Sequence, residues 1–367
     1  MNYKWNYEAP TTEDQACAEG LAEEVRVSPA IAQLLVARGI RTPDGARKYF
    51  RPQLLDLHNP YLMKDMDRAV ERLNEAMGQR ERIMVYGDYD VDGCTAVALV
   101  YRFITQFYSN VECYIPDRNE EGYGVSRKGV DYAASQGVKL VIVLDCGIKA
   151  TDEIQYAKDL GIDFIICDNH VPDEVLPPAV AILNAKRVDN TYPYLDLSGC
   201  GVGFKFMQAF AISNGIPFST LIPLLDLCSI SIASDIVPIM GENRILAYHG
   251  LRQLNNNPSV GVKAMIDVCG LTGKELTMSD IIFKIGPRIN ASGRVQNGKE
   301  SVNLLVERDE EKAHKMAENI NRYNEERKEL DKRMTEEASH VVAHLPQMED
   351  KSNRRSEERR VGKECRS

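Results

Sequence analysis

The chain has 367 residues, of which 44% are hydrophobic, and its formal net charge at pH 7 is −9. This length allows more than one domain, and the apolar content is enough for a sizeable core. The negative charge excludes a uniformly basic surface, so a nucleic acid would have to be held by bound cations and local Arg or Lys patches.

No apolar run approaches the roughly 20 residues needed to cross a bilayer, and the start of the chain lacks the apolar core of a signal peptide. We therefore expect a cytoplasmic protein with no membrane partner. The nine cysteines form no CxxC pair. They are typical of buried thiols in a reducing compartment and argue against a zinc site.

In chain order, residues 1–80 have the pattern of helices and turns and are expected to form an N-terminal helical segment. Strand-like apolar runs then alternate with helix-length segments. The runs are 83–86, 111–115, 140–144, 164–167 and 180–183. This alternation predicts an α/β fold with a parallel, doubly wound sheet, whose core we place at 81–190.

The remaining segments follow from periodicity and charge. Residues 191–305 are mostly helical in pattern and are expected to complete this domain. Residues 306–346 have apolar positions at helical spacing opposite a charged face, which predicts one long connecting helix. Residues 347–367 are mostly charged or polar, and we interpret them as a disordered or foreign tail.

The densest acidic cluster lies in the run from Gly87 to Gly93, where Asp88, Asp90 and Asp92 occupy every second position. Three carboxylates so close together repel one another unless a cation neutralises them. The apolar run before them reads as a buried parallel strand, and open α/β sheets bind their ligands at the carboxyl ends of such strands. A divalent metal site is the resulting hypothesis.

Three further acids have similar surroundings. Asp145 and Asp168 follow strand-like runs, and Asp235 interrupts a long apolar helical stretch. The ends of parallel strands share one edge of a sheet, so these carboxylates are expected to converge, with His170 beside them. Oxygen ligands with one imidazole suit Mg²⁺ or Mn²⁺, and two such ions would clamp a phosphodiester and activate a water.

Other known motifs fit the same residues less well. The run from Asp88 begins like a calcium-binding EF-hand loop, but its twelfth position is Leu99 instead of Glu. A phosphatase nucleophile loop of the haloacid dehalogenase type would place Thr directly after Gly93, where Cys94 stands; it remains a minor alternative. The run from Gly199 to Phe204 lacks the last Gly of a dinucleotide loop, and close helix packing explains it better.

Several motifs in order resemble those of the DHH phosphoesterase family, and within it the RecJ-type single-stranded-DNA exonucleases. The motif stretches are 87–93, 144–147, 168–170 and 234–238, and two stretches typical of the exonuclease branch are 116–124 and 286–294. The resemblance covers roughly residues 80–340. It implies a two-metal hydrolase, using Mn²⁺ or Mg²⁺, that removes nucleotides from the 5′ end of single-stranded DNA in DNA repair and recombination.

The resemblance also assigns roles to residues. The implied metal ligands, or their immediate supports, are Asp88, Asp90, Asp92, Asp145, His170 and Asp235. The implied catalytic triplet is Asp168, Asn169 and His170, in which Asp168 helps to orient the ligands. Arg118, Arg288, Asn290 and Arg294 are candidates for binding the DNA backbone, because guanidinium groups pair bidentately with phosphate. The Gly, Pro and Asn residues around Arg288 and Arg294 favour a shaped loop, whereas Arg118 alone fits a surface ion pair equally well.

Two departures from the family pattern qualify these expectations. Asn169 replaces the first His of the triplet, and an amide oxygen is the weaker ligand for Mn²⁺. The chain also has no Gly-Gly-His motif of a DHH-associated domain, so we expect a truncated protein with impaired DNA grip. Two alternatives stay open: hydrolysis of short oligonucleotides or cyclic dinucleotides, and a weakly active nucleic-acid-binding module. Protein partners are not predicted by the sequence.

Overall fold

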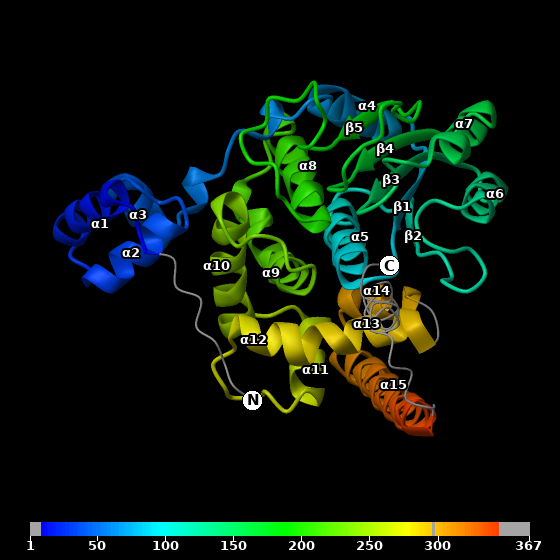
Figure 1. The fold of residues 1–367 in the computed structure, drawn as a ribbon. Coiled ribbons are helices and arrows are strands. Elements are labelled where there is room, and N and C mark those ends of the chain that lie inside the picture. The colour runs from blue at the N-terminus through cyan, green and yellow to red at the C-terminus, as the bar shows by residue number, and fades with distance from the viewer. Residues whose placement is uncertain (1–8, 296–297, 345–367) are drawn as a thin grey trace. The chain divides into compact units, whose positions relative to one another are not determined.

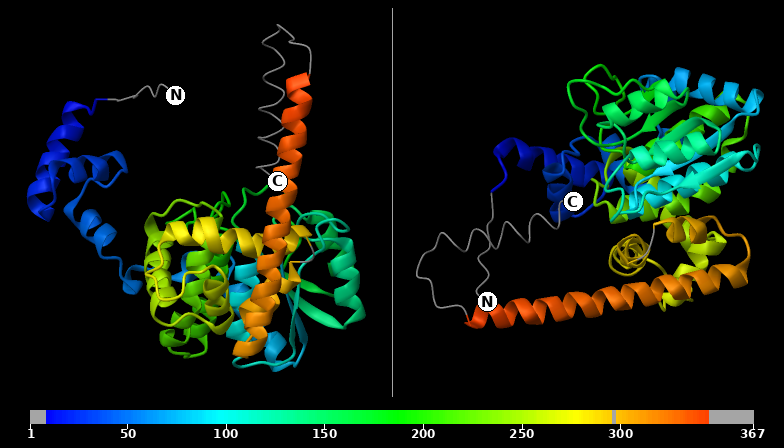
Figure 2. Two further views of the ribbon diagram at one scale, coloured as in Figure 1. Left: turned by 90° about the horizontal axis from the view of Figure 1, so that it is seen from below. Right: turned by 90° about the vertical axis from the view of Figure 1, so that its right-hand side faces the viewer.

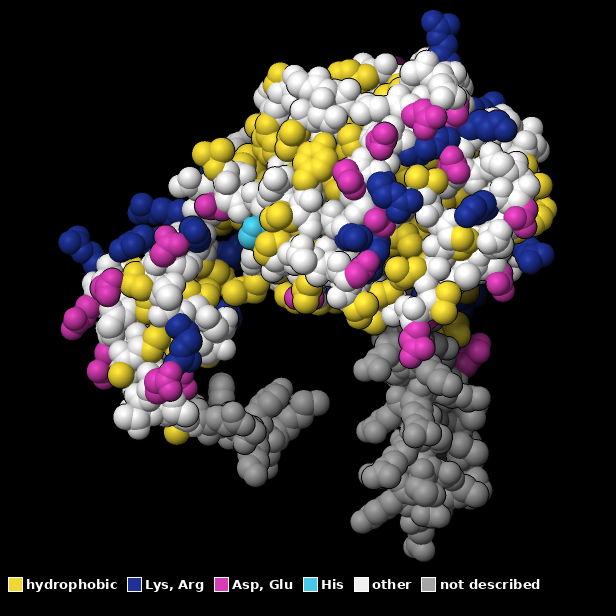
Figure 3. Space-filling view, turned by 90° about the horizontal axis from the view of Figure 1, so that it is seen from above, with side chains coloured by type: hydrophobic (Ala, Val, Ile, Leu, Met, Phe, Trp, Pro, Cys, Tyr) yellow, Lys and Arg dark blue, Asp and Glu magenta, His cyan; other side chains and the backbone are white. Residues whose placement is uncertain are grey.

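The computed structural model describes residues 9–295 and 298–344, so the predicted tail 347–367 lies outside the described residues. The chain divides into two compact units, Met1–Tyr323 and Asn324–Ser367. None of the helices in the described part of the chain combines the length and apolar character that a membrane crossing requires. On the face shown in Figure 3, Lys and Arg side chains are interspersed with Asp and Glu side chains.

Five parallel strands form one sheet in the spatial order β2-β1-β3-β4-β5 (Figure 1). The strands are β1 (Arg82–Gly87), β2 (Val111–Tyr114), β3 (Val138–Leu144), β4 (Asp163–Cys167) and β5 (Ala181–Leu183). The predicted parallel, doubly wound sheet is thereby confirmed. Gly87 pairs with Leu144, and Leu144 pairs with Cys167, so β1, β3 and β4 end at the same level of the sheet.

Helices cover both faces of the sheet, as Figure 1 and Figure 2 show. Successive strand residues point to opposite faces. In β1, Ile83 and Val85 join the core formed with α4 (Met66–Gly78), α5 (Val91–Ile104) and α8 (Gly199–Ser213). Met84 and Tyr86 join a second core with α6 (Arg127–Ser135) and α7 (Thr151–Asp159). Strands buried on both faces explain the continuous apolar runs in the sequence.

The other elements are helical, as the sequence predicts. The α-helices are α1 (Thr12–Val25), α2 (Pro29–Ala37), α3 (Pro43–Phe50), α9 (Leu225–Ser234), α10 (Gly241–Asn256), α11 (Val260–Val268), α12 (Met278–Asp280), α13 (Gly286–Val295), α14 (Lys299–Val306) and α15 (Glu310–His344). Short 3₁₀ turns are η1 (Leu54–Asp56), η2 (Pro60–Leu62), η3 (Phe218–Thr220) and η4 (Ile222–Leu224), and η5 (Ile281–Ile285) is a π-helix. The division at residues 80, 190, 305 and 346 stays a prediction.

The interpretation of residues 286–294 as a loop is wrong, because they form helix α13. Pro287 lies directly after the π-helix η5, an irregularity of the helical hydrogen bonding at which a residue without an N–H can be accommodated. Gly286 is needed for close packing, since a Cβ there would lie 2.7 Å from Ser234 Oγ on α9. Glycine and proline therefore mark the junction of η5 and α13, which packs against a neighbouring helix.

A buried network joins the segment after α3 to two helices of the domain. Lys205 on α8 is fully buried, and its Nζ donates to Glu242 Oε1 (3.0 Å) and to the carbonyl oxygen of His58 (2.6 Å). Glu242 on α10 also accepts from the His58 N–H (3.0 Å) and from the Tyr192 hydroxyl (2.6 Å). Burial lowers the pKa of Lys205, while Glu242 opposes this effect.

Candidate metal centre

Carboxylates follow three of the strands at one edge of the sheet. Asp88, Asp145 and Asp168 come directly after β1, β3 and β4, and each is at most 3% exposed. The backbone N–H of Asp145 donates to Cys167 O (2.9 Å) and that of Asp168 to Leu183 O (3.1 Å), so sheet-like hydrogen bonding continues into these residues. The sheet thereby fixes where their side chains start.

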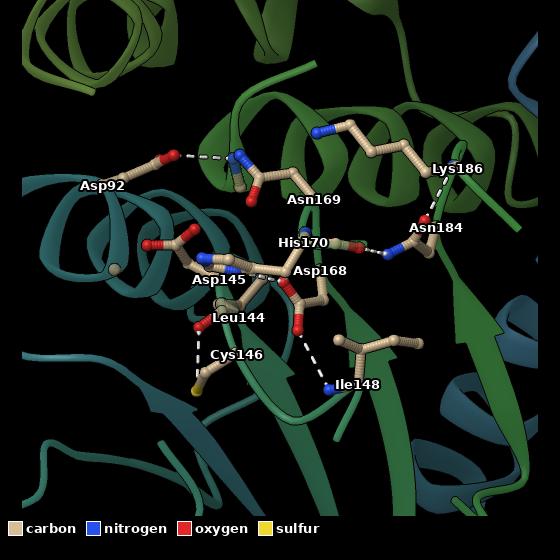
Figure 4. Close-up of polar contacts among 12 residues, drawn as sticks. Asp92, Leu144, Asp145, Cys146, Ile148, Asp168, Asn169, His170, Asn184 and Lys186 are labelled. Carbon is tan, nitrogen blue, oxygen red and sulfur yellow. Dashed lines mark hydrogen bonds and ion pairs between the residues drawn. The ribbon is translucent and has the colours of Figure 1, made fainter. Parts of the chain in front are cut away.

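Asp168 holds His170 in one orientation. Asp168 Oδ1 lies 2.7 Å from His170 Nδ1 and accepts from the His170 backbone N–H (3.0 Å), while Oδ2 accepts from the Ile148 N–H (2.9 Å; Figure 4). The hydrogen bond that His170 donates to the Asp168 carboxylate raises the pKa of His170. With Nδ1 occupied, Nε2 is the nitrogen available to a metal ion. Three residues could together hold an ion: Asp145, Asp168 and His170 each offer one ligand atom, and these three atoms lie within 4.8 Å of one another.

Asp88 is the clearest indication of a cation-binding site. It is fully buried, and neither carboxylate oxygen makes a hydrogen bond of ordinary geometry with a described residue. Burial, followed by the charge of Asp90, raises the pKa of Asp88 to about 7, and the nearby backbone N–H groups of Tyr89, Gly124 and Asp90 oppose this rise only in part. Asp90 caps α5 by accepting from the Gly93 N–H (3.0 Å). A buried polar group without a partner is costly, and a bound cation would remove that cost.

Asp92 has different surroundings. Its Oδ2 accepts from the Gly199 N–H (2.7 Å), and its Oδ1 accepts from the Cys200 N–H (2.8 Å) and the Ser231 hydroxyl (2.7 Å). Burial, then the charges of Asp235 and Asp90, raise the pKa of Asp92 to about 8. Both oxygens are already engaged at the start of α8, so the arrangement fits a support better than a ligand.

Asp235 reaches the strand ends from the helical part of the domain. It follows α9, and the Asn169 amide Nδ2 donates to its Oδ2 (3.4 Å). Burial, then the charge of Asp90, raise the pKa of Asp235 to about 6. The acids predicted to converge therefore influence one another electrostatically, and Asn169 faces a carboxylate through its donor end.

The backbone around Asp145 allows a very close approach by α8. Asp145 has φ 59°, a left-handed conformation that Asp tolerates better than most residues. Burial, then neighbouring carboxylates led by Asp92, raise the pKa of Asp145 well above its usual value. A Cβ at Gly199 would lie 2.4 Å from Asp145 Oδ1, so only glycine fits there without moving the carboxylate.

We therefore expect Gly199→Ala to weaken Mn²⁺ binding by about 10- to 100-fold, the range typical of groups that orient metal ligands. Isothermal titration calorimetry measures the affinity. Gly20→Ala is the matched control, because a Cβ at Gly20 in α1 meets no atom within 4 Å. Wild-type affinity in Gly199→Ala would show that the Asp145 carboxylate does not contribute to the site.

The donor set fits a hard divalent cation. It combines several carboxylates, one of them with two unpartnered buried oxygens, with one imidazole whose other nitrogen is held by Asp168. Carboxylate oxygens suit Mg²⁺ and Mn²⁺, and imidazole nitrogen favours Mn²⁺ over Mg²⁺. The described residues are thus compatible with either metal.

The predicted DNA-binding residues differ in their surroundings and in their distance from the acids. The guanidinium of Arg118 lies 5.4 Å from the centre of the Tyr89 ring, next to Asp88. Arg288 donates to Lys284 O and to Asn321 Oδ1 (both 2.8 Å), so α13 and α15 hold its guanidinium. Asn290 is half-buried on α13, and the side chain of Arg294 lies outside the described residues.

Three further residues lie at the site although the sequence patterns did not point to them. The Tyr123 hydroxyl donates to Asp145 O (3.2 Å) and lies 3.3 Å from His170 Nε2. Asn184 and Lys186 follow β5 at the same sheet edge and lie beside the triplet in Figure 4. The signal that revealed Asp168, a polar residue directly after a strand, also applied to Asn184.

Comparisons with known proteins agree with this geometry. The model of the DHH family, N-terminal domain, matches residues 82–232. The single-stranded-DNA-specific exonuclease RecJ of Bacillus subtilis (strain 168) is 36% identical over 339 residues, covering 92% of this chain and 42% of the relative. The chain thus spans less than half the length of that relative.

Two solved structures are similar as well. A crystal structure of RecJ in complex with Mn²⁺ from Thermus thermophilus has a TM-score of 0.75 at 27% identity, covering 91% of this chain and 46% of that one. A crystal structure of exonuclease RecJ bound to manganese has a TM-score of 0.70 at 30% identity. The match covers 78% of this chain and 71% of that one. The motif order, the parallel sheet and the acids at its edge agree with these matches. The chain belongs to the DHH family.

Proposed function

We propose that the chain is the metal-dependent phosphodiesterase part of a 5′-to-3′ exonuclease that acts on single-stranded DNA in DNA repair and recombination. The observation that carries this proposal is the convergence of Asp88, Asp145, Asp168 and His170 at one sheet edge, with Asp88 fully buried and unpartnered. The similarity to exonucleases named RecJ supports the choice of substrate. The 5′ polarity rests on that similarity alone.

Each residue has a role that its contacts support. We assign Asp88, Asp90, Asp145, His170 and Asp235 as ligands for Mn²⁺ or Mg²⁺, with two ions bound. Such ions, when bound, neutralise phosphate oxygens and lower the pKa of a water. Asp168 accepts a hydrogen bond from the Nδ1–H of His170, so Nε2, which lies 3.3 Å from the Tyr123 hydroxyl, is the nitrogen that would bind a metal ion. Asp92 fixes α8 against α5 and α9.

Arg118 is the predicted DNA-binding residue whose placement best fits that role. Its guanidinium lies over Tyr89, which directly follows the buried Asp88. A guanidinium at this position can pair with a phosphate whose neighbour is at the metal centre. Arg288, Asn290 and Arg294 stay predictions. We further infer a cytoplasmic location and the domain division at residues 80, 190, 305 and 346.

A substrate panel tests the proposed function. The purified chain is incubated with Mn²⁺ and four substrates: 5′-phosphorylated single-stranded DNA, the same sequence as a duplex, a short oligoribonucleotide and a cyclic dinucleotide. We expect mononucleotides from single-stranded DNA in preference to the duplex. Hydrolysis of only the small substrates would overturn the DNA assignment. DNA binding without turnover at saturating Mn²⁺ would instead favour a binding module.

Asn169→His is expected to preserve or raise Mn²⁺-dependent hydrolysis, because an imidazole nitrogen is the better ligand for Mn²⁺. Titrating Mn²⁺ against the initial rate gives both the apparent metal affinity and the maximal rate. Asn169→Ala serves as the control, since it removes the donor that faces Asp235. Complete loss of activity in Asn169→His would show that the amide has a role of its own.

A further inference from the structure

The segment that leaves β5 is rigidly attached beside the metal centre. Asn184 is fully buried, its Nδ2 donates to His170 O (2.8 Å), and its Oδ1 accepts from the Lys186 N–H (2.7 Å; Figure 4). On the other side, Arg187 donates to Asp65 Oδ2 (2.6 Å) and pairs with Asp189 (2.7 Å). The backbone of Lys186 is therefore fixed relative to His170.

The Lys186 side chain extends from this segment toward Asn169, as Figure 4 shows. Asn169 in turn donates to Asp235 Oδ2 (3.4 Å), so the Lys186 side chain extends toward the side of the site where Asp235 lies. Among the described side chains, Lys186 has no close ion-pair partner, whereas the neighbouring Arg187 is paired with two carboxylates. The ammonium group of Lys186 thus lies at the edge of the acidic centre without a close ion-pair partner among the described side chains.

We propose that Lys186 is a substrate-binding residue that contacts a phosphate of the DNA strand at the metal centre. The proposal rests on the proposed function. When cations neutralise the carboxylates, Asp235 attracts the ammonium group less strongly, and a phosphate of a strand bound at the centre is then a suitable anionic partner. An ammonium on a flexible stem can follow a phosphate without a bidentate geometry.

The test separates DNA binding from metal binding. Lys186→Gln is compared with Lys139→Gln, which removes the same charge from an exposed position near the start of β3, at the opposite edge of the sheet. Fluorescence anisotropy of a 5′-phosphorylated single strand is recorded across a KCl series, with Ca²⁺ in place of Mn²⁺ to slow hydrolysis. Calorimetry then measures Mn²⁺ affinity without DNA.

We expect Lys186→Gln to weaken DNA binding about tenfold, as the loss of one charge-assisted hydrogen bond would. The slope of log affinity against log salt should fall by about 0.7, the value for one phosphate contact on a single strand. Mn²⁺ affinity should stay equal or increase, because a cation competing for Asp235 is removed. Lys186→Arg should restore DNA binding, and Lys139→Gln should match the wild type.

Unchanged DNA affinity and salt slope in Lys186→Gln would overturn the proposal. A parallel loss of Mn²⁺ affinity would also overturn it, since that result indicates a structural role. Wild-type hydrolysis of the same strand with Mn²⁺ is measured alongside. If the wild type degrades the strand while Lys186→Gln binds it normally, only the role of Lys186 fails. If the wild type neither binds nor degrades it, the proposed function fails as well.

Discussion

Asp145→Asn is expected to reduce Mn²⁺-stimulated release of mononucleotides from single-stranded DNA by about 10³-fold or more, because loss of a metal ligand removes several kcal/mol of charge stabilisation. Asn keeps the shape of the side chain and tolerates the left-handed backbone at this position. The fold should therefore survive, and thermal melting checks that it does. Release is measured by chromatography of the products from a 5′-labelled strand.

Asp152→Asn is the control for charge. Asp152 is exposed in the first turn of α7, so its replacement should leave the rate within twofold of the wild type. Undiminished release of mononucleotides by Asp145→Asn would contradict the assignment of the metal centre. Equal losses in both variants would point to a general electrostatic effect and not to a ligand.

The largest effect on stability is expected for Lys205→Met, with a loss of about 3–5 kcal/mol in the free energy of unfolding. Met fills similar volume but leaves the buried Glu242 without its cation. Adding Glu242→Gln should recover part of the loss, because it removes the buried unpaired charge and its amide oxygen can still accept from one of the two donors, the His58 N–H or the Tyr192 hydroxyl. Urea unfolding of the two single variants and the double variant measures this coupling.

An exposed ion pair supplies the comparison. Lys263 pairs with Glu310 at 3.1 Å, and the two side chains are 54% and 73% exposed. Surface pairs of this kind contribute about 0–1 kcal/mol, so Lys263→Met should be nearly neutral. If Lys205→Met proved as mild as Lys263→Met, the network would not stabilise the fold as argued.

The sheet and most of the centre could be predicted because their signals are local. Each strand is a continuous apolar run, and Asp88, Asp145 and Asp168 directly follow such runs. Parallel strands put their carboxyl ends at one edge, so proximity in space follows from position in the sequence. The topology of the sheet therefore brings acids that are far apart in the sequence together in space.

The residues that escaped prediction depend on contacts between distant segments. Gly199 looked like helix packing, but its neighbour is the Asp145 carboxylate. Lys205 lies in an apolar helical run, and its partner Glu242 is 37 residues further along the chain. Gly286 and Pro287 suggested a loop because the same residues that break helices can also begin them. No local pattern distinguishes these outcomes.

The hydrogen bonds of Asp92 affect how fast the centre can bind metal ions. They tie the start of α8 to α5 and α9, and we expect them to hold the surrounding acids in place with or without a bound ion. Loading then needs no folding step, unlike sites that form only when metal binds. Its speed is set by how readily the ion sheds water, which Mg²⁺ does reluctantly. When the protein is transferred from a solution of Mg²⁺ to one of Mn²⁺, we therefore expect the bound metal to exchange without unfolding. The metal found in the site should then depend on the concentrations of the two ions in solution.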